Sequence, residues 1–276
     1  MSIDAEASNS KTSDLAIAGL SPQQIVLIGA SNLVLGWPAL IRSLRQLTAA
    51  PLNLNVAIGM GRSYIKTSAV WFRQLPSINA SGLWDHLPCD MSQAPRVLIT
   101  DIGNDLVYLF EPNDIVVSLR QSIKRILAWR SDARIVMTGL PLDSVARIGK
   151  MRYLVARTIL FPGCFLPHST ILARSLVLEK LVQDLAAEYR IAFVQPESHW
   201  YGMDPIHVLP KYRETAFLKY FAPFDLAAAT AASLNHKATT KKRVPLPTAA
   251  ERTLFWQNKT VKQPVFQSPD CVVSAW

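Results

Sequence analysis

Short apolar runs alternate along the chain with longer segments of helical periodicity, and this alternation constrains the fold more than any other feature. The runs lack polar alternation, which is typical of strands buried on both faces. Strands that alternate with helices indicate βαβ units, right-handed crossovers and a parallel sheet. The sequence therefore predicts an α/β fold around a central parallel sheet of about five strands. The predicted strands are residues 24–28, 53–58, 96–102, 134–138 and 191–194, and the clearest helical patterns are residues 33–47, 113–129 and 169–189.

The chain length and its charge distribution predict one domain flanked by two extensions. Residues 22–234 hold the strands and helices, and half of all 276 residues are hydrophobic, which suits a packed core. Residues 1–21 carry acidic residues where a signal peptide is basic, so we expect a disordered leader. Residues 235–276 contain seven Lys or Arg and two acidic residues, a net +5 of the chain's +9. We expect a basic extended tail, pinned to the body by its aromatic residues.

The position of the positive charge argues against specific nucleic-acid binding. A basic tail is typically a solvated extension, so we expect at most weak contact with an anionic surface. The three cysteines, Cys89, Cys164 and Cys271, are widely spaced, which indicates neither a disulfide framework nor a metal site. The most hydrophobic stretch, residues 153–172, contains Arg157 and two prolines and is a poor membrane span. We expect a cytoplasmic protein without cofactor or metal, and the sequence predicts no oligomeric state.

Polar segments follow the predicted strands at the edge where parallel sheets gather their chemistry. They are GASN at residues 29–32, GMGRS at 59–63, GND at 103–105 and, further downstream, DPIH at 204–207. Taken singly, each has an ordinary structural interpretation: a helix cap, a turn or a buried histidine. Together they would bring a serine, a glycine, an amide and an Asp/His pair to one rim.

These residue types suit nucleophilic catalysis. The Ser31 hydroxyl becomes a nucleophile only when a base such as His207 takes its proton. Asp204, three residues before His207, could hold the imidazole in the required tautomer. The oxyanion formed on attack needs preorganised donors. The candidates are the Ser31 backbone N–H, a glycine N–H within residues 59–61 and the side-chain amide of Asn104.

The order Ser31, Gly61, Asn104, Asp204 and His207 resembles the four sequence blocks of the SGNH (GDSL-type) hydrolase superfamily. The resemblance covers about residues 24–208 and implies a three-layer, flavodoxin-like sandwich. It implies that Ser31 is the nucleophile, that His207 is the base and that Asp204 orients the histidine. It also implies that Gly61 and Asn104 complete an oxyanion hole with the Ser31 amide.

Two positions depart from the family pattern. Ala30 stands where the first block usually has aspartate, and Ile102 stands at the glycine position of the third block. In the second block, Gly61 is preferred because the GRS that it opens resembles the family's Gly-Asp-Thr/Ser, and Gly59 is the alternative. No G-x-S-x-G nucleophile motif occurs in the sequence. Asp101 and Asp105 flank Asn104, where we expect them to order its loop.

The favoured function is a serine esterase or deacylase that acts on a small-molecule, carbohydrate or lipid ester through an acyl-enzyme. An O-acyltransferase on the same fold is the alternative, and a non-catalytic binding module is a third hypothesis that leaves the four blocks unexplained. Residues 146–170 are longer than an ordinary connection and both apolar and basic. They indicate either a lid over the site or an extra helix packed on the body.

Overall fold

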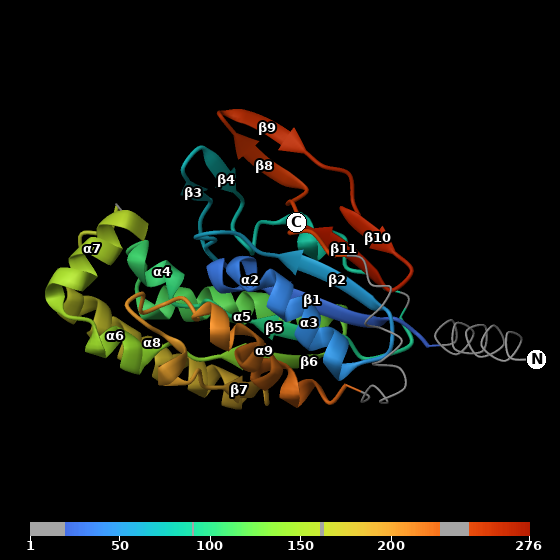
Figure 1. Cartoon of the computed structure of the whole chain (residues 1–276), viewed down its shortest axis with the longest axis horizontal. Helices are drawn as coiled ribbons and strands as arrows, with labels where there is room; N and C mark the ends of the chain where they lie inside the picture. Colours follow the sequence, from blue (N-terminus) through green and yellow to red (C-terminus); the bar gives the residue numbers. More distant parts are fainter. Residues whose placement is uncertain (1–19, 90, 161–162, 227–242) are drawn as a thin grey trace, which may run out of the picture.

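The computed structural model describes residues 20–89, 91–160, 163–226 and 243–276, and its centre is a seven-stranded sheet (Figure 1). The strand order is β10-β11-β2-β1-β5-β6-β7, and every neighbouring pair is parallel except β10 with β11. The strands are β1 Gln23–Ile28, β2 Leu52–Ala57, β5 Arg96–Ile99, β6 Arg134–Thr138, β7 Ala192–Val194, β10 Phe266–Ser268 and β11 Cys271–Ala275.

The predicted α/β class is confirmed, and the five predicted strands correspond to β1, β2, β5, β6 and β7. Numbered along the chain, these five lie in the order 2-1-3-4-5, which is the flavodoxin-like order. The order reverses between β1 and β5, and ligands bind at such a switch point in open α/β sheets. The third predicted strand ends at Ile99 instead of residue 102, because Asp101 turns the backbone into the left-handed region at φ 59°.

The C-terminal segment differs from the predicted extended tail, and it adds two strands to the five that the sequence predicts for the sheet. Instead of an extension from residue 235, strand β11 pairs in parallel with β2, and β10 adds an antiparallel edge strand. The physical reason is the alternation of Cys271, Val273 and Ala275, which are buried on the sheet. Residues 227–242 and the predicted leader up to residue 19 lie outside the described residues.

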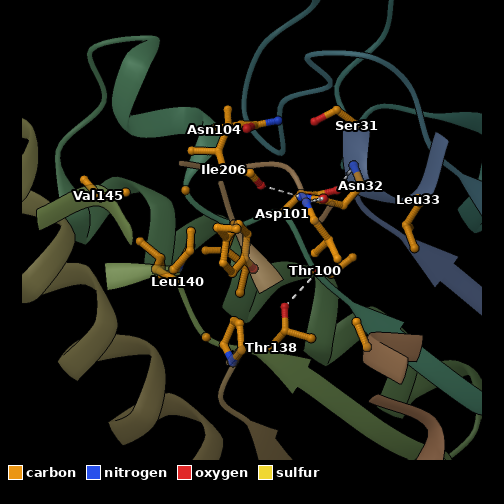
Figure 2. Close-up of a pocket in the computed structure, with 18 of the residues that line it drawn as sticks. Ser31, Asn32, Leu33, Thr100, Asp101, Asn104, Thr138, Leu140, Val145 and Ile206 are labelled. Carbon is orange, nitrogen blue, oxygen red and sulfur yellow. Dashed lines mark hydrogen bonds between the residues drawn. The ribbon is translucent and has the colours of Figure 1, made fainter. Parts of the chain in front are cut away.

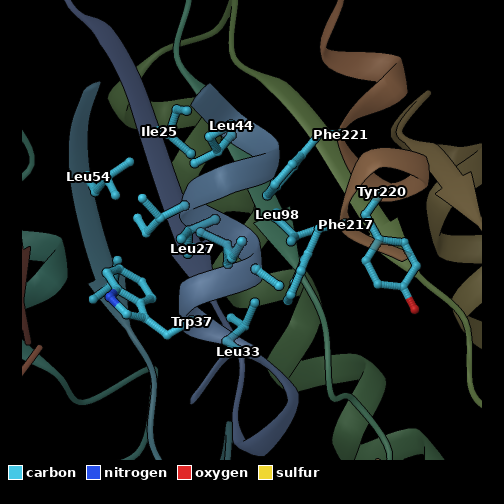
Figure 3. Packing of buried hydrophobic residues seen from close by; sticks show 14 of the residues in the cluster. Ile25, Leu27, Leu33, Trp37, Leu44, Leu54, Leu98, Phe217, Tyr220 and Phe221 are labelled. Carbon is cyan, nitrogen blue, oxygen red and sulfur yellow. The ribbon is translucent and has the colours of Figure 1, made fainter. Parts of the chain in front are cut away.

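Helices cover both faces of the sheet. On one face α3 (Trp37–Leu47) packs against α9 (Arg213–Phe221), and on the other α5 (Pro112–Trp129) packs against α8 (His168–Glu188). Alternate strand residues feed the two cores: Leu27 enters the first and Ile28 the second. Figure 3 shows the first core, where α9 rings meet α2, α3 and the sheet through Leu33, Trp37, Leu44, Leu54, Leu98, Phe217 and Phe221.

The helix predicted over residues 33–47 is divided at Gly36 into α2 (Ser31–Leu35) and α3. A Cβ at Gly36 would lie 2.5 Å from the Phe217 ring, so the chain needs glycine where α9 approaches. The other two predicted helices are confirmed as α5 and α8.

The remaining elements connect the layers or form a small second sheet. The second sheet has the order β3-β4-β8-β9, with strands Ser68–Val70, Arg73–Leu75, Glu251–Leu254 and Gln257–Thr260. The short helices are α4 Asn104–Val107, α6 Leu142–Arg147, α7 Lys150–Leu160, η1 Gly82–Asp85, η2 Ser198–Trp200, η3 Pro210–Tyr212 and η4 Ala222–Phe224. Among the described helices, none is both long and apolar enough to cross a membrane.

Residues 146–170 include the end of α6, helix α7 and the start of α8, with residues 161–162 outside the described part. Figure 1 shows α7 at one end of the molecule. The helix packs on α8 and exposes Met151, Leu154 and Val155. The segment therefore supplies an extra helix, and its action as a lid stays a prediction.

Candidate active site

Ser31 is the first residue of α2 and follows directly on the turn that ends β1. Its side chain is 5% exposed and makes no capping hydrogen bond, since the N-cap position is occupied by Ala30. The interpretation of Ser31 as an ordinary helix cap is therefore wrong. The hydroxyl is free to face another partner across the edge of the sheet.

That partner is His207, on the loop that follows η2. The distance from His207 Nε2 to Ser31 Oγ is 2.8 Å, and the distance from His207 Nδ1 to Asp204 Oδ2 is 2.6 Å. Because Nδ1 faces a carboxylate, it carries the ring hydrogen, which leaves Nε2 to accept the Ser31 proton. The structure thus brings Ser31, His207 and Asp204 into one chain of hydrogen bonds.

The local turn holds Asp204 in its ionised form. Asp204 Oδ1 accepts hydrogen bonds from the backbone N–H groups of Ile206 at 3.0 Å and His207 at 3.2 Å. Burial pushes the pKa of Asp204 upward, but the hydrogen bond and charge of His207 and these two amides outweigh it, so the pKa lies below its usual value. An ionised Asp204 would stabilise the positive charge of the His207 imidazole whenever that ring takes up a proton.

Asn104 lies beside Ser31, at the first position of α4. Figure 2 shows the side-chain amide of Asn104 and the hydroxyl of Ser31 pointing toward one another. Asn104 is 8% exposed, and its Nδ2 lies 3.5 Å from the carbonyl oxygen of Arg62, a long hydrogen bond. The Ser31 backbone N–H has no acceptor among the described residues. Both donors are therefore available to an oxyanion formed at Ser31.

The structure separates the two candidate glycines of the second block. Gly61 has φ 63°, and its carbonyl oxygen accepts a hydrogen bond of 2.6 Å from the hydroxyl of Tyr108. Burial first, and the charge of Asp105 second, raise the pKa of Tyr108 to about 12, so the hydroxyl stays a donor. Gly61 precedes Arg62, whose carbonyl meets Asn104, whereas Gly59 lines a different cavity. Gly61 thus adjoins the residue that contacts Asn104, and its role as the second-block oxyanion donor stays a prediction.

A largely apolar cavity of about 100 Å³ opens next to Ser31 and Asn104 (Figure 2). It runs from the switch point between β1 and β5 toward α6, α8 and α9. Its floor carries Asp101, Asn32 and a hydrogen-bonded pair of threonine hydroxyls, Thr100 and Thr138, 2.8 Å apart. Its apolar walls come from Leu33, Ile102, Leu106, Val107, Leu140, Val145, Ile171, Val208 and Phe217.

The acidic residues that flank Asn104 have different partners. Asp105 is fully buried and accepts hydrogen bonds from the Ser63 hydroxyl and from the Tyr64 N–H, the latter at 2.9 Å. It ties the second-block loop to the Asn104 loop, in line with its predicted role. The Asp101 carboxylate instead binds the turn around Ser31, together with Asn32. No sequence motif singled out Asn32, since its partners lie 69 and 174 residues away.

Within the described part of the chain, no three His, Cys, Asp or Glu side chains gather as metal ligands would. Cys164 and Cys271 are buried, and Cys89 is exposed. Outside the candidate triad, the His168 ring contacts the Val145 carbonyl oxygen at 2.8 Å, and this backbone contact accounts for its position.

No model of a known protein family matches the chain, and no curated protein matches its sequence. Its structure is similar to a provisionally assigned arylesterase from Agrobacterium tumefaciens, with TM-score 0.49, 16% identity, and coverage of 74% of this chain and 100% of that one. An inhibitor-bound aryl esterase from M. smegmatis has a TM-score of 0.46 and 13% identity, and the match covers 79% of this chain and 100% of that one. A GDSL-like lipase from Bacteroides thetaiotaomicron has a TM-score of 0.42 and 12% identity, and the match covers 78% of this chain and 97% of that one. Because these TM-scores lie below 0.5, the similarities carry no argument about function, and the function proposed below rests on the geometry of the site.

Proposed function

We propose that the protein is a serine-dependent carboxylic ester hydrolase. The observation that carries this proposal is the continuous chain from Ser31 Oγ through His207 to Asp204, with distances of 2.8 and 2.6 Å. A structural histidine does not need a serine hydroxyl on one nitrogen and an ionised carboxylate on the other. This arrangement supplies a nucleophile, a base and the group that orients the base.

In the proposed first step, His207 Nε2 takes the proton from Ser31 Oγ as the oxygen attacks the ester carbonyl carbon. The carbonyl oxygen becomes an oxyanion, which the Ser31 N–H, the Asn104 amide and the Gly61 N–H would stabilise. When the carbonyl re-forms, the alkoxide leaves and takes the proton from His207, so that an acyl group remains on Ser31. Asp204 stabilises the imidazolium throughout without taking its proton.

In the second step, a water molecule replaces the alcohol. His207 takes one proton from the water as its oxygen attacks the acyl carbon, and the same oxyanion donors act again. Ser31 then leaves with the proton held by His207, which releases the carboxylic acid and restores the enzyme. Each turnover therefore consumes one ester and one water and needs no further reactant.

The cavity beside Ser31 suits an apolar portion of the ester. Its walls are mostly aliphatic, and a transferred CH₂ group gains about 0.8 kcal/mol by leaving water. The two threonine hydroxyls on its floor are hydrogen-bonded to each other, with Thr138 as the donor and Thr100 as the acceptor. We therefore expect short or medium aliphatic acyl chains to be accepted better than charged ones.

The test uses a p-nitrophenyl organophosphonate, which reacts with an activated serine and releases a coloured phenol. We expect stoichiometric labelling at Ser31, located by mass spectrometry, and hydrolysis of p-nitrophenyl butyrate by the unlabelled enzyme. Ser31→Ala should lose both reactions while it unfolds at an unchanged temperature. Labelling at another residue, or full activity of Ser31→Ala, would refute the proposal.

A further inference from the structure

The backbone on both sides of Ser31 is held by one carboxylate. Asp101 Oδ2 accepts hydrogen bonds from the N–H of Ala30 at 2.8 Å and from the N–H of Asn32 at 3.1 Å. Asp101 itself has φ 59°, a conformation that aspartate tolerates better than most residues, and which aims its carboxylate across the switch point. The turn that presents Ser31 is therefore fixed from the loop that follows β5, without any contact to the Ser31 hydroxyl.

The backbone on both sides of His207 is held by one side-chain amide. Asn32 Nδ2 donates to the carbonyl oxygen of Ile206 at 2.9 Å, and Asn32 Oδ1 accepts from the N–H of Val208 at 2.9 Å. Asn32 Nδ2 also donates to Asp101 Oδ1 at 2.7 Å. Both amide hydrogens and the amide oxygen are thus engaged, which fixes the orientation of the amide group.

These contacts place Asn32 and Asp101 at the junction of the nucleophile turn and the base loop. We propose that the two are positioning residues that set the separation between Ser31 Oγ and His207 Nε2, a role that rests on the proposed function. The link runs through backbone groups and through neither reacting side chain. It therefore keeps the 2.8 Å approach while the proton moves and the histidine changes charge. A misplacement of about 1 Å at such a site costs about 10²-fold in rate.

The polarity of the link distinguishes positioning from simple packing. Asn32→Asp keeps the shape of the side chain but turns the donor that faces two oxygens, those of Asp101 and Ile206, into an acceptor. Oxygen then meets oxygen, and two negative charges lie together. Asn32→Ala removes the contacts without adding repulsion. A packing role predicts that alanine is the more harmful change, whereas the positioning role predicts that aspartate is.

The experiment measures kcat and KM on p-nitrophenyl butyrate, together with the rate of organophosphonate labelling. For Asn32→Asp we expect kcat to fall about 10²-fold with little change in KM, and labelling to slow in parallel. Asn32→Ala should show a smaller fall in kcat than Asn32→Asp. In the double variant Asn32→Asp with Asp101→Asn, the new amide can donate to the new carboxylate. We expect it to recover about tenfold in kcat over Asn32→Asp alone.

Asn79 provides a matched control. Its Nδ2 donates to the Ser118 carbonyl and hydroxyl oxygens, and its Oδ1 accepts from the Ser122 hydroxyl, a bonding pattern like that of Asn32 but directed at α5. Asn79→Asp should lower the unfolding temperature without changing kcat or the labelling rate.

Three results would overturn the positioning role. One is an Asn32→Asp variant that turns over and is labelled as fast as the wild type. The second is an Asn32→Ala variant with a lower kcat than Asn32→Asp, and the third is a double variant no faster than Asn32→Asp. A wild type that is neither labelled at Ser31 nor active on esters would instead refute the proposed function, so the two failures are distinguishable.

Discussion

The buried carboxyl group of Asp105 makes the stability of the fold depend on pH. Burial raises the pKa of Asp105 from 3.8 to about 6, against the opposing effects of the Ser63 and Tyr64 hydrogen bonds and the Lys66 charge. The folded chain thus binds the proton more tightly than the unfolded chain does. Stability from this group is complete below the unfolded pKa and is lost as the pH rises through about 6.

The magnitude follows from the size of the shift. About two pKa units correspond to about 3 kcal/mol over the whole titration. Between pH 8 and pH 4.5 about 2 kcal/mol of this appears, because the unfolded carboxyl has only begun to bind its proton at pH 4.5. Asp105→Asn removes the titration. The substitution also weakens hydrogen bonds, which lowers the free energy of unfolding by the same amount at every pH. Only the part of the difference between wild type and Asp105→Asn that changes with pH therefore tests the titration.

The assay is urea unfolding of wild type and Asp105→Asn at pH 4.5, 6 and 8. The free energy of unfolding of the wild type, minus that of Asp105→Asn, should rise by about 2 kcal/mol as the pH falls from 8 to 4.5. Asp132→Asn is the control, because the hydrogen bond to Arg130 lowers the pKa of exposed Asp132 below 3.8. Its titration therefore lies below the assayed range, and the wild-type minus Asp132→Asn difference should stay nearly constant between pH 4.5 and 8. A wild-type minus Asp105→Asn difference that stays constant with pH would refute the reasoning.

Three further substitutions probe the site. Asn104→Ala should lower kcat on p-nitrophenyl butyrate by about 10²- to 10³-fold with a small change in KM, since the proposed function makes the Asn104 amide an oxyanion donor; an unchanged kcat would exclude that role. Tyr108→Phe removes the hydrogen bond that fixes Gly61 and should cost about 1 kcal/mol, seen as a several-fold loss of kcat in the same assay. Ile171→Phe fills the apolar cavity and should shift the preferred p-nitrophenyl ester toward shorter acyl chains; an unaltered chain-length profile would place the acyl group elsewhere.

Much of the fold could be predicted because each central strand is buried on both faces and reads as a continuous apolar run. The candidate triad could also be predicted, since its members follow strand ends and the topology brings strand ends together. Strand β11 could not be, because its alternating pattern is short and follows a polar segment. Its place depends on β2, which lies more than 200 residues earlier.

The contacts of Asn32 and Asp101 escaped sequence reasoning for a related reason. A side-chain amide next to a serine has no periodicity, and its meaning arises only when Ile206 and Val208 fold onto it. The break at Gly36 likewise depends on a ring from α9. Local pattern indicates which segments are strands or helices, and pairing between distant segments decides what their polar side chains do.

The buried guanidinium of Arg62 links the site to the order in which the chain is synthesised. It is 0% exposed, and it donates to the carbonyl oxygens of Ile58, Pro76 and Trp276. Burial first, and the charge of Arg73 second, lower its pKa to about 9. The ribosome makes Trp276 after every other element of the sheet. The loop that carries Gly61 therefore lacks its last anchor until residue 276 has been synthesised, later than the segments that carry Ser31, Asp204 and His207.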